Sequence, residues 1–206
     1  MERQEKPTKP VPLFLSYAYE DELLLRELEK HLHLLKQLGL ITLWHRRQIV
    51  AGTDWAMVID EHLEQAALIL LLISPDYLAS TYSRDEMQRA LELHEQKRAW
   101  VLPILLRQVD LQGTDLSKLK PLPTNEKPIM KWSKRDEAFC DITRSLRQII
   151  AGLSVSSHTG LLASQQSPSG SGSRDDHVKV PLVNTSWPHA EYDQTELPLP
   201  ANVFCF

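Results

Sequence analysis

The stretch ALILLLIS, residues 67–74, decides the fold of this chain because it is apolar up to its last residue. A strand with one face in water alternates apolar and polar residues, whereas a central parallel strand is covered on both faces and is apolar throughout. Pro75 follows directly and ends the run. The stretch therefore predicts a buried parallel strand with helices packed on both faces of its sheet.

Strand-like and helix-like patterns alternate on both sides of this stretch. Leucines recur at helical spacing between Asp21, a predicted N-cap, and Gly39, which suits a helix C-terminus. Because the connections are too long for hairpins, the alternation favours an α/β fold with a parallel sheet. Besides residues 67–74, the predicted strands are residues 11–17, 40–44, 100–106 and 128–132, and the predicted helices are residues 21–38, 54–66, 79–97 and 135–153.

Composition divides the chain into four parts. Residues 1–10 are charged and proline-rich and are predicted to be flexible, whereas residues 11–153 form the α/β domain. Residues 154–178 are rich in serine and glycine without periodicity, which is typical of a linker. Residues 179–206 carry apolar and aromatic anchors but too little mass for a core. We predict that they form a mostly disordered tail with a short docking segment, or the remnant of a further domain.

Charge and hydropathy exclude several classes of function. The formal net charge is −4, so no basic surface indicates binding to nucleic acid or to an anionic membrane. The longest apolar run, residues 66–73, is too short to span a bilayer, and the N-terminus lacks the apolar core of a signal peptide. Two cysteines make no disulfide framework. We expect a soluble, cytoplasmic protein with no nucleic-acid or membrane partner.

The chain lacks the common catalytic and metal-binding motifs. No glycine-rich phosphate loop, dinucleotide fingerprint or nucleophile elbow is present. His31 and His33 are two residues apart and would lie on different faces of a helix, and Cys140 falls where a small core residue is expected. Ser74 stands where a receiver domain of the same architecture needs a phosphoacceptor aspartate. We expect no metal and no cofactor.

Polar side chains gather where the predicted strands end. Ligands of open α/β sheets bind outside the carboxyl ends of the strands, and Ser16 and residues 44–47 end the first two. Glu86 lies about two turns into the helix after the third strand, with Tyr82 four residues earlier on the same face. This spacing allows a site there. Taken alone, however, a helical glutamate near an arginine such as Arg89 is more often a surface ion-pair partner.

Four stretches of the chain resemble one family in their order and spacing. They are PLFLSYAYED (12–21), LWHRRQIVAGTDWAMVIDEHLEQA (43–66), LILLLISPDYLASTYSRDEMQRAL (68–91) and MKWSKRDEAFCDITRSLRQII (130–150). Together they are similar to a Toll/interleukin receptor (TIR) domain of the stand-alone bacterial type, over residues 12–153. The resemblance implies a flavodoxin-like, five-stranded parallel sheet with helices on both faces. It also identifies residues 45–53 as the BB loop of the family.

The resemblance implies one of two activities. Members of the family either act as signalling adaptors through TIR–TIR contacts or cleave NAD+ at the nicotinamide–ribose bond, as glycohydrolases or cyclases. The enzymatic members share a short motif around the catalytic glutamate. It begins with an aromatic residue and a small residue, and the glutamate stands three positions after the small one. Residues 82–86, YSRDE, match this pattern with Tyr82, Ser83 and Glu86. By this resemblance Glu86 is the catalytic residue, and NAD+ is a substrate, not a cofactor.

One carboxylate is enough for this chemistry. Glycoside hydrolases commonly use two, one of them to protonate a poor leaving group. The nicotinamide of NAD+ is already cationic and departs as a neutral molecule, so no general acid is required. An ionised Glu86 then has only to bind the ribose hydroxyls and stabilise an oxocarbenium-like transition state.

The resemblance also points to residues that bind the substrate. Tyr82 offers a ring face, although some active members have tryptophan there, and Val50 replaces an acidic residue that some of them carry. Trp44 is equally a candidate for packing at the end of the sheet. Arg46 and Arg47 are equally candidates for contacts with a partner or with solvent. The substrate-binding candidates are Ser16, Tyr17, Ala18, Trp44, Arg46, Arg47 and Tyr82.

A non-enzymatic adaptor is the alternative function, and it belongs to a different class. In that case residues 45–53 dock on another TIR domain, either a second copy or a partner, in signal transduction or defence. Self-association is expected for the enzyme as well, so association alone does not separate the two. Consumption of NAD+ by the assembled protein separates the enzyme from the adaptor.

Overall fold

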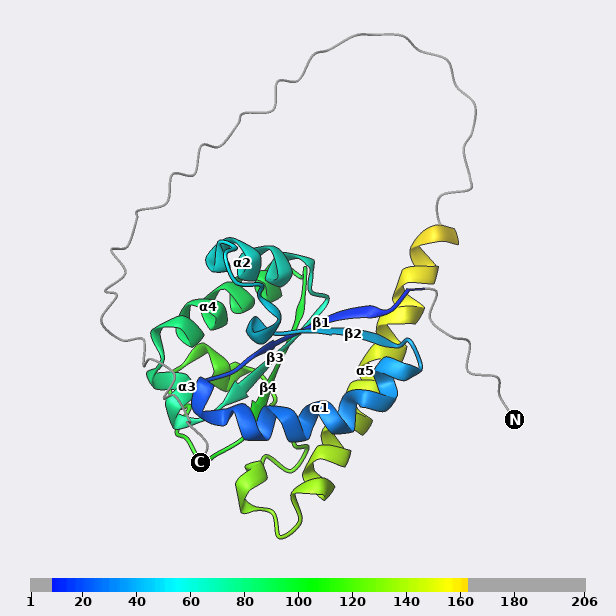
Figure 1. The fold of residues 1–206 in the computed structure, drawn as a ribbon. Coiled ribbons are helices and arrows are strands. Elements are labelled where there is room, and N and C mark those ends of the chain that lie inside the picture. The colour runs from blue at the N-terminus through cyan, green and yellow to red at the C-terminus, as the bar shows by residue number, and fades with distance from the viewer. Residues whose placement is uncertain (1–8, 163–206) are drawn as a thin grey trace, which may run out of the picture. The chain divides into compact units, whose positions relative to one another are not determined.

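The computed structural model describes residues 9–162 of the chain (Figure 1). Its strands are β1 (Val11–Ser16), β2 (Ile41–Trp44), β3 (Leu68–Ile73) and β4 (Trp100–Leu105). They form one parallel sheet in the order β2-β1-β3-β4. Every residue of β3 is buried, so the prediction of a central strand covered on both faces is confirmed.

Helices cover both faces of this sheet (Figure 1). α1 (Glu22–Gln37) and α5 (Arg135–Leu162) pack on one face around a leucine-rich cluster. α2 (Trp55–Gln65), α3 (Pro75–Ala79) and α4 (Thr81–Glu95) pack on the other face around a second cluster. The predicted α/β architecture is therefore confirmed. Single-turn 3-10 helices lie at Tyr19–Asp21, Arg46–Gln48, Asp115–Lys118 and Ile129–Lys131.

The strand order defines where a ligand would bind. From β1 the chain passes to β2 on one side and then crosses to β3 on the other side of β1. The carboxyl ends of β1 and β3 therefore lie at the switch point of the sheet, where open α/β sheets bind their ligands.

Capping residues set several helix ends. Gly39 follows α1 with φ 67°, a conformation that glycine adopts without strain, and Asp54 accepts a hydrogen bond from the backbone N–H of Met57 at 3.3 Å. The helix predicted for residues 79–97 is preceded by a separate short helix, α3. The backbone of Ser80 is extended between the two, and its side chain caps α4 by accepting from the Ser83 N–H.

The segment predicted as the fifth strand, residues 128–132, forms a single 3-10 turn instead. Leu122 takes the place beside β4, where it pairs with Ile104 in an isolated parallel bridge. Pro121 and Pro123 flank Leu122 and lack backbone N–H groups, so the bridge does not extend into a ladder within the described residues.

α5 is longer than predicted. It continues to Leu162 instead of ending near residue 153, so the first residues assigned to the linker are helical. A helix that is already nucleated extends at little cost, and no proline interrupts this segment before Pro168. The rest of the predicted linker, the tail at residues 179–206 and the first eight residues lie outside the described part of the chain. Between residues 9 and 162, no helix is long and apolar enough to cross a lipid bilayer.

Candidate functional site

Glu86 is a buried carboxylate at the carboxyl edge of the sheet, only 6% exposed. It lies on α4, and its Oε2 accepts a hydrogen bond from the hydroxyl of Ser16, the last residue of β1. The guanidinium of Arg46 lies 3.2 Å from Oε1 and 3.3 Å from Oε2. The structure thus brings together three of the residues predicted for the site, and Glu86 is not a surface ion-pair partner.

Arg46 covers this carboxylate from the loop after β2. The loop turns directly at the end of the strand in the 3-10 helix Arg46–Gln48, which directs the side chain back over the sheet edge. The guanidinium lies 5.3 Å from the ring centroid of Tyr17, a cation–π distance, and the side chain stays 25% exposed. Arg46 therefore closes the site on its solvent side.

Burial and pairing act on Glu86 in opposite directions. Loss of water around the carboxylate raises the pKa of Glu86, while Arg46 and the hydrogen bond from Ser16 lower it, and the net pKa shift is upward. Burial likewise raises the pKa of Tyr17 to about 12, so this phenol stays protonated. Upward-shifted carboxyl groups next to a cationic partner are typical of functional sites.

Tyr77 contacts the same Ser16 hydroxyl that bonds to Glu86. It lies on α3, is fully buried, and its hydroxyl is 3.0 Å from Ser16 Oγ. Sequence analysis missed this residue, although a tyrosine four residues after the end of a buried strand, in SPDYLA, was a signal that could have found it.

A second buried carboxylate lies at the same edge. Asp21 accepts a hydrogen bond from Ser74 Oγ and lies 3.1 Å from Arg107 Nη2, which also pairs with Asp76. Burial raises the pKa of Asp21, while Ser74 and Arg107 lower it. Asp21 was predicted as a helix N-cap. It holds that position but makes no capping hydrogen bond, because its side chain is engaged by Ser74 and Arg107.

The remaining candidates take different places. Ala18 is buried and packs in the cluster under α2 and α4. Trp44 stacks between the rings of Phe14, at 5.2 Å, and His62, at 4.1 Å, which is the packing role left open for it. Arg47 pairs with Glu22 at 3.0 Å.

Tyr82 lies at the outer edge of the site. It is 39% exposed, four residues before Glu86 on α4, and meets the ring of Trp55 edge-on at 5.3 Å. Trp55 begins α2 and was not predicted. Ser83, the small residue of the motif, is buried, and its hydroxyl donates to the Tyr17 carbonyl oxygen at 3.5 Å.

The loop at residues 45–53 presents both charge and apolar surface. His45 is buried and lies 2.9 Å from Glu29, which ties the start of the loop to α1. Val50 is 70% exposed at the other end of the loop. Gly52 has φ 89°, a left-handed conformation that favours glycine at this turn.

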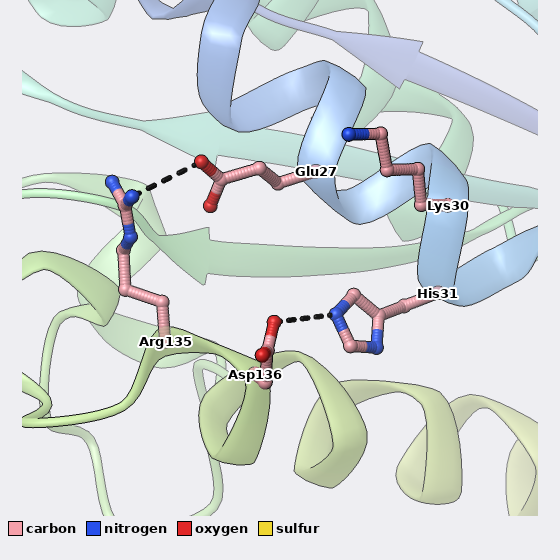
Figure 2. Close-up of a pocket in the computed structure, with 5 residues that line it drawn as sticks. All are labelled: Glu27, Lys30, His31, Arg135 and Asp136. Carbon is pink, nitrogen blue, oxygen red and sulfur yellow. Dashed lines mark hydrogen bonds and ion pairs between the residues drawn. The ribbon is translucent and has the colours of Figure 1, made fainter.

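A surface pocket of about 410 Å³ lies elsewhere, between α1 and the start of α5 (Figure 2). Arg135 pairs with Glu27 at 3.1 Å across it, and His31 lies 3.2 Å from Asp136. Its helices pack on the face of the sheet opposite α4. None of the predicted site residues lines this pocket, and its opposite charges face one another, so the candidate site remains at Glu86.

No metal site is evident in the described residues. Within residues 9–162 no three His, Cys, Asp or Glu side chains are grouped so that they could hold a metal ion. The expectation that Cys140 is a core residue is wrong: it is exposed beside the buried Phe139, 3.9 Å from His31 Nδ1. α5 buries one face only, and Cys140 lies at its margin.

Comparisons with known proteins identify the family of this chain. The family model for the TIR domain matches residues 13–139, more than half of the chain. The chain belongs to the TIR domain family. An uncharacterised protein, y4lF of Sinorhizobium fredii, is 44% identical to this TIR chain over 137 residues, which are 66% of the chain and 42% of that protein. The chain thus spans well under half of the length of this relative.

A solved TIR domain shows the same fold. The TIR domain of the Toll-related receptor TRR-2 from Hydra magnipapillata superposes with a TM-score of 0.50 and 19% identity, over 66% of this chain and 97% of that one. TIR domains of the activated Roq1 resistosome, which directly recognises the pathogen effector XopQ, match less closely. Their TM-score is 0.39, with 22% identity over 46% of this chain and 56% of theirs.

Proposed function

We propose that this TIR domain, once self-assembled, cleaves the nicotinamide–ribose bond of NAD+ in a signalling or defence pathway, with Glu86 as its catalytic residue. The observation that carries the proposal is the buried Glu86 carboxylate at the switch point of the sheet, held by Ser16 and Arg46. A merely structural surface glutamate would not be buried with its carboxylate oriented by two partners.

The reaction needs little beyond this carboxylate. The bond between ribose C1′ and the nicotinamide nitrogen breaks, its electron pair neutralises the nicotinamide cation, and positive charge develops on the ribose. An ionised Glu86 in a site of low dielectric stabilises that charge strongly. Attack by water on C1′ gives ADP-ribose and releases a proton, whereas attack by a ring nitrogen of the adenine gives a cyclic product.

Arg46 links this chemistry to assembly. It now contacts both carboxylate oxygens of Glu86, so the ribose can reach Glu86 only if the guanidinium moves aside. Arg46 belongs to the loop at residues 45–53, and we propose that docking of another TIR domain on this loop displaces it. The freed guanidinium is then available for the pyrophosphate of NAD+, and the exposed ring of Tyr82 for the nicotinamide or adenine base.

A non-catalytic adaptor is the second candidate. It is favoured by the exposed apolar side chains along the loop and the start of α2, Val50 and Met57, which suit a protein contact. The closed state of Glu86 would then be its permanent state, with Arg46 acting as a structural ion pair.

Release of nicotinamide tests the proposal. Purified protein is incubated with NAD+ both dilute and crowded to favour assembly, with light scattering recorded alongside. We expect release only when the protein is assembled, and at least a hundredfold loss for Glu86→Gln, which keeps the shape of the side chain. Glu92→Gln, a change on the same helix away from the site, is the matched control. Assembly without release of nicotinamide would establish the adaptor. Equal release by Glu86→Gln and the unmodified protein would remove Glu86 from the mechanism.

A further inference from the structure

A one-way series of hydrogen bonds connects Glu86 to Tyr77. An ionised carboxylate only accepts hydrogen bonds, so the single hydroxyl proton of Ser16 is directed to Glu86 Oε2. Ser16 Oγ can then only accept from its other neighbour, Tyr77 Oη, 3.0 Å away. Tyr77 is therefore the donor to Ser16. Through this bond the phenol orients the Ser16 hydroxyl, which in turn donates to the carboxylate.

Tyr77 is itself held at both ends. Its side chain is fully buried on α3, and its backbone N–H donates to Ser74 Oγ at 3.0 Å. The Ser74 hydroxyl donates in turn to Asp21, whose carboxylate pairs with Arg107. Burial therefore holds the ring in place, and the bond to Ser74 holds the start of the helix that carries it.

We propose that Tyr77 is a positioning residue for the reaction at Glu86: its hydroxyl fixes the rotation of Ser16 so that Ser16 donates to the carboxylate. The catalytic meaning of this inference rests on the proposed function, whereas the effect of Tyr77 on the carboxyl group of Glu86 does not. A serine hydroxyl without a second partner rotates freely and can turn its proton elsewhere.

Removal of the phenol hydroxyl has a definite electrostatic consequence. The hydrogen bond from Ser16 favours the ionised form of Glu86, so weakening it raises the pKa of Glu86 further. Tyr77 and Tyr17 stay protonated in the relevant pH range because burial raises the pKa of each. The charged or titratable groups that act on Glu86 are Arg46 from the loop after β2, Tyr17 from the residue after β1, Tyr77 from α3 and Asp85 from α4 itself.

Tyr77→Phe tests this inference, because it removes one oxygen and keeps the ring. Carbon-13 NMR of protein labelled at glutamate side chains follows the titration of Glu86, identified by the signal that Glu86→Gln removes. We expect the titration midpoint of the Glu86 carboxyl group to rise by about one pH unit. The pH at which kcat for nicotinamide release falls off on the acid side should rise by the same amount, at constant KM. Tyr19→Phe, the same change at an exposed tyrosine, should shift neither.

Two further variants make the test independent of a simple loss of structure. Ser16→Ala should raise the midpoint of Glu86 as well, and adding Tyr77→Phe to it should change nothing more, because the two residues act in series. Difluorotyrosine placed at position 77 is a stronger donor and should lower the midpoint. An unchanged midpoint in Tyr77→Phe and in the fluorinated protein would overturn the inference. Absence of nicotinamide release by the unmodified protein would overturn the proposed function and leave the NMR comparison valid.

Discussion

Arg46 and Glu86 lie 40 residues apart in the sequence, yet the guanidinium sits 3.2 and 3.3 Å from the two oxygens of a carboxylate that is almost fully buried. The pair is asymmetric, because Arg46 is one quarter exposed and Glu86 is not. Water can therefore solvate the arginine when the pair opens, whereas Glu86 would be left as a buried charge until a ligand reaches it. Of the two side chains, Arg46 is therefore the one that can move into water at the lower cost.

Arg46→Gln should therefore destabilise the protein in a pH-dependent way. At pH 7 we expect the free energy of unfolding to fall by about 1–3 kcal/mol, because the buried carboxylate loses its counter-charge. The loss should shrink at lower pH as Glu86 becomes protonated. Urea unfolding between pH 5 and 8 measures it. Arg47→Gln is the control, since its ion pair with Glu22 is more exposed and such pairs contribute less than about 1 kcal/mol. Equal losses in both variants would argue against a buried, charged Glu86.

Glu86→Gln should become relatively more stable than the unmodified protein as the pH rises. The pKa of Glu86 is raised in the folded state, so the folded protein holds this proton over a pH range in which the unfolded chain has lost it. Stability from this group is therefore present at acid pH and is lost as the pH rises through the folded-state pKa, by at most about 1.4 kcal/mol per pH unit. Glutamine does not titrate. A stability difference that is flat with pH would mean that the pKa of Glu86 is not raised.

The residues that sequence analysis identified lie close together in the sequence or share a periodicity. The run at residues 67–74 and the spacing of Tyr82 and Glu86 are local patterns. The first predicted the buried central strand, and the second pointed to a carboxylate that the structure buries on α4. The hydrogen bonds from Tyr77 to Ser16 and from Ser74 to Asp21 span 61 and 53 residues. No local pattern encodes which of two buried polar groups will meet across a sheet, so this part of the site could not be predicted.

The proline in β4 shows the same limit. A proline such as Pro103 is unusual inside a strand, because proline donates no hydrogen bond to a sheet. In the structure the N–H groups of Trp100 and Leu106 donate to the β3 side, whereas that of Leu105 donates outward to Leu122. Pro103 shares the outward orientation of Leu105, so no bond to β3 is missing. Only the register, which the sequence does not reveal, decides that this proline is tolerated.

Tyr82 should affect the binding of substrate more than the chemistry. Because its ring is partly exposed beside Trp55, Tyr82→Ala removes a stacking face and leaves Glu86 in place. Under the proposed function we expect KM for NAD+ to rise about tenfold, the effect of losing one aromatic–base contact, with kcat within about threefold. Tyr82→Trp should retain or lower KM. Steady-state assays on assembled protein measure both, and a drop in kcat alone would place Tyr82 at the reacting atoms instead.

Asp21→Ala should be among the most destabilising changes at the sheet edge. It leaves the buried hydroxyl of Ser74 without its acceptor and removes one of the two carboxylates paired with Arg107. We expect a loss of about 2–4 kcal/mol in the free energy of unfolding, measured in urea. Asp115→Ala, which removes only a surface pair with Lys118, should cost less than about 1 kcal/mol. A small effect of Asp21→Ala would show that water replaces the carboxylate, and that α3 is held by other contacts.

Deletion of residues 154–206 should leave the stability of the TIR domain almost unchanged. The described core ends on α5 with Ile150, which is buried, and with Leu153 packed against it, so the deletion removes none of these contacts. We expect the melting temperature to change by less than about 2 °C, while partner choice or activation changes. A second truncation, after Leu162, keeps the whole of α5 and separates the contribution of its last turns from that of the residues beyond them. If only the shorter protein melts early, the end of α5 packs on the domain; if both do, the residues after 162 belong to its core.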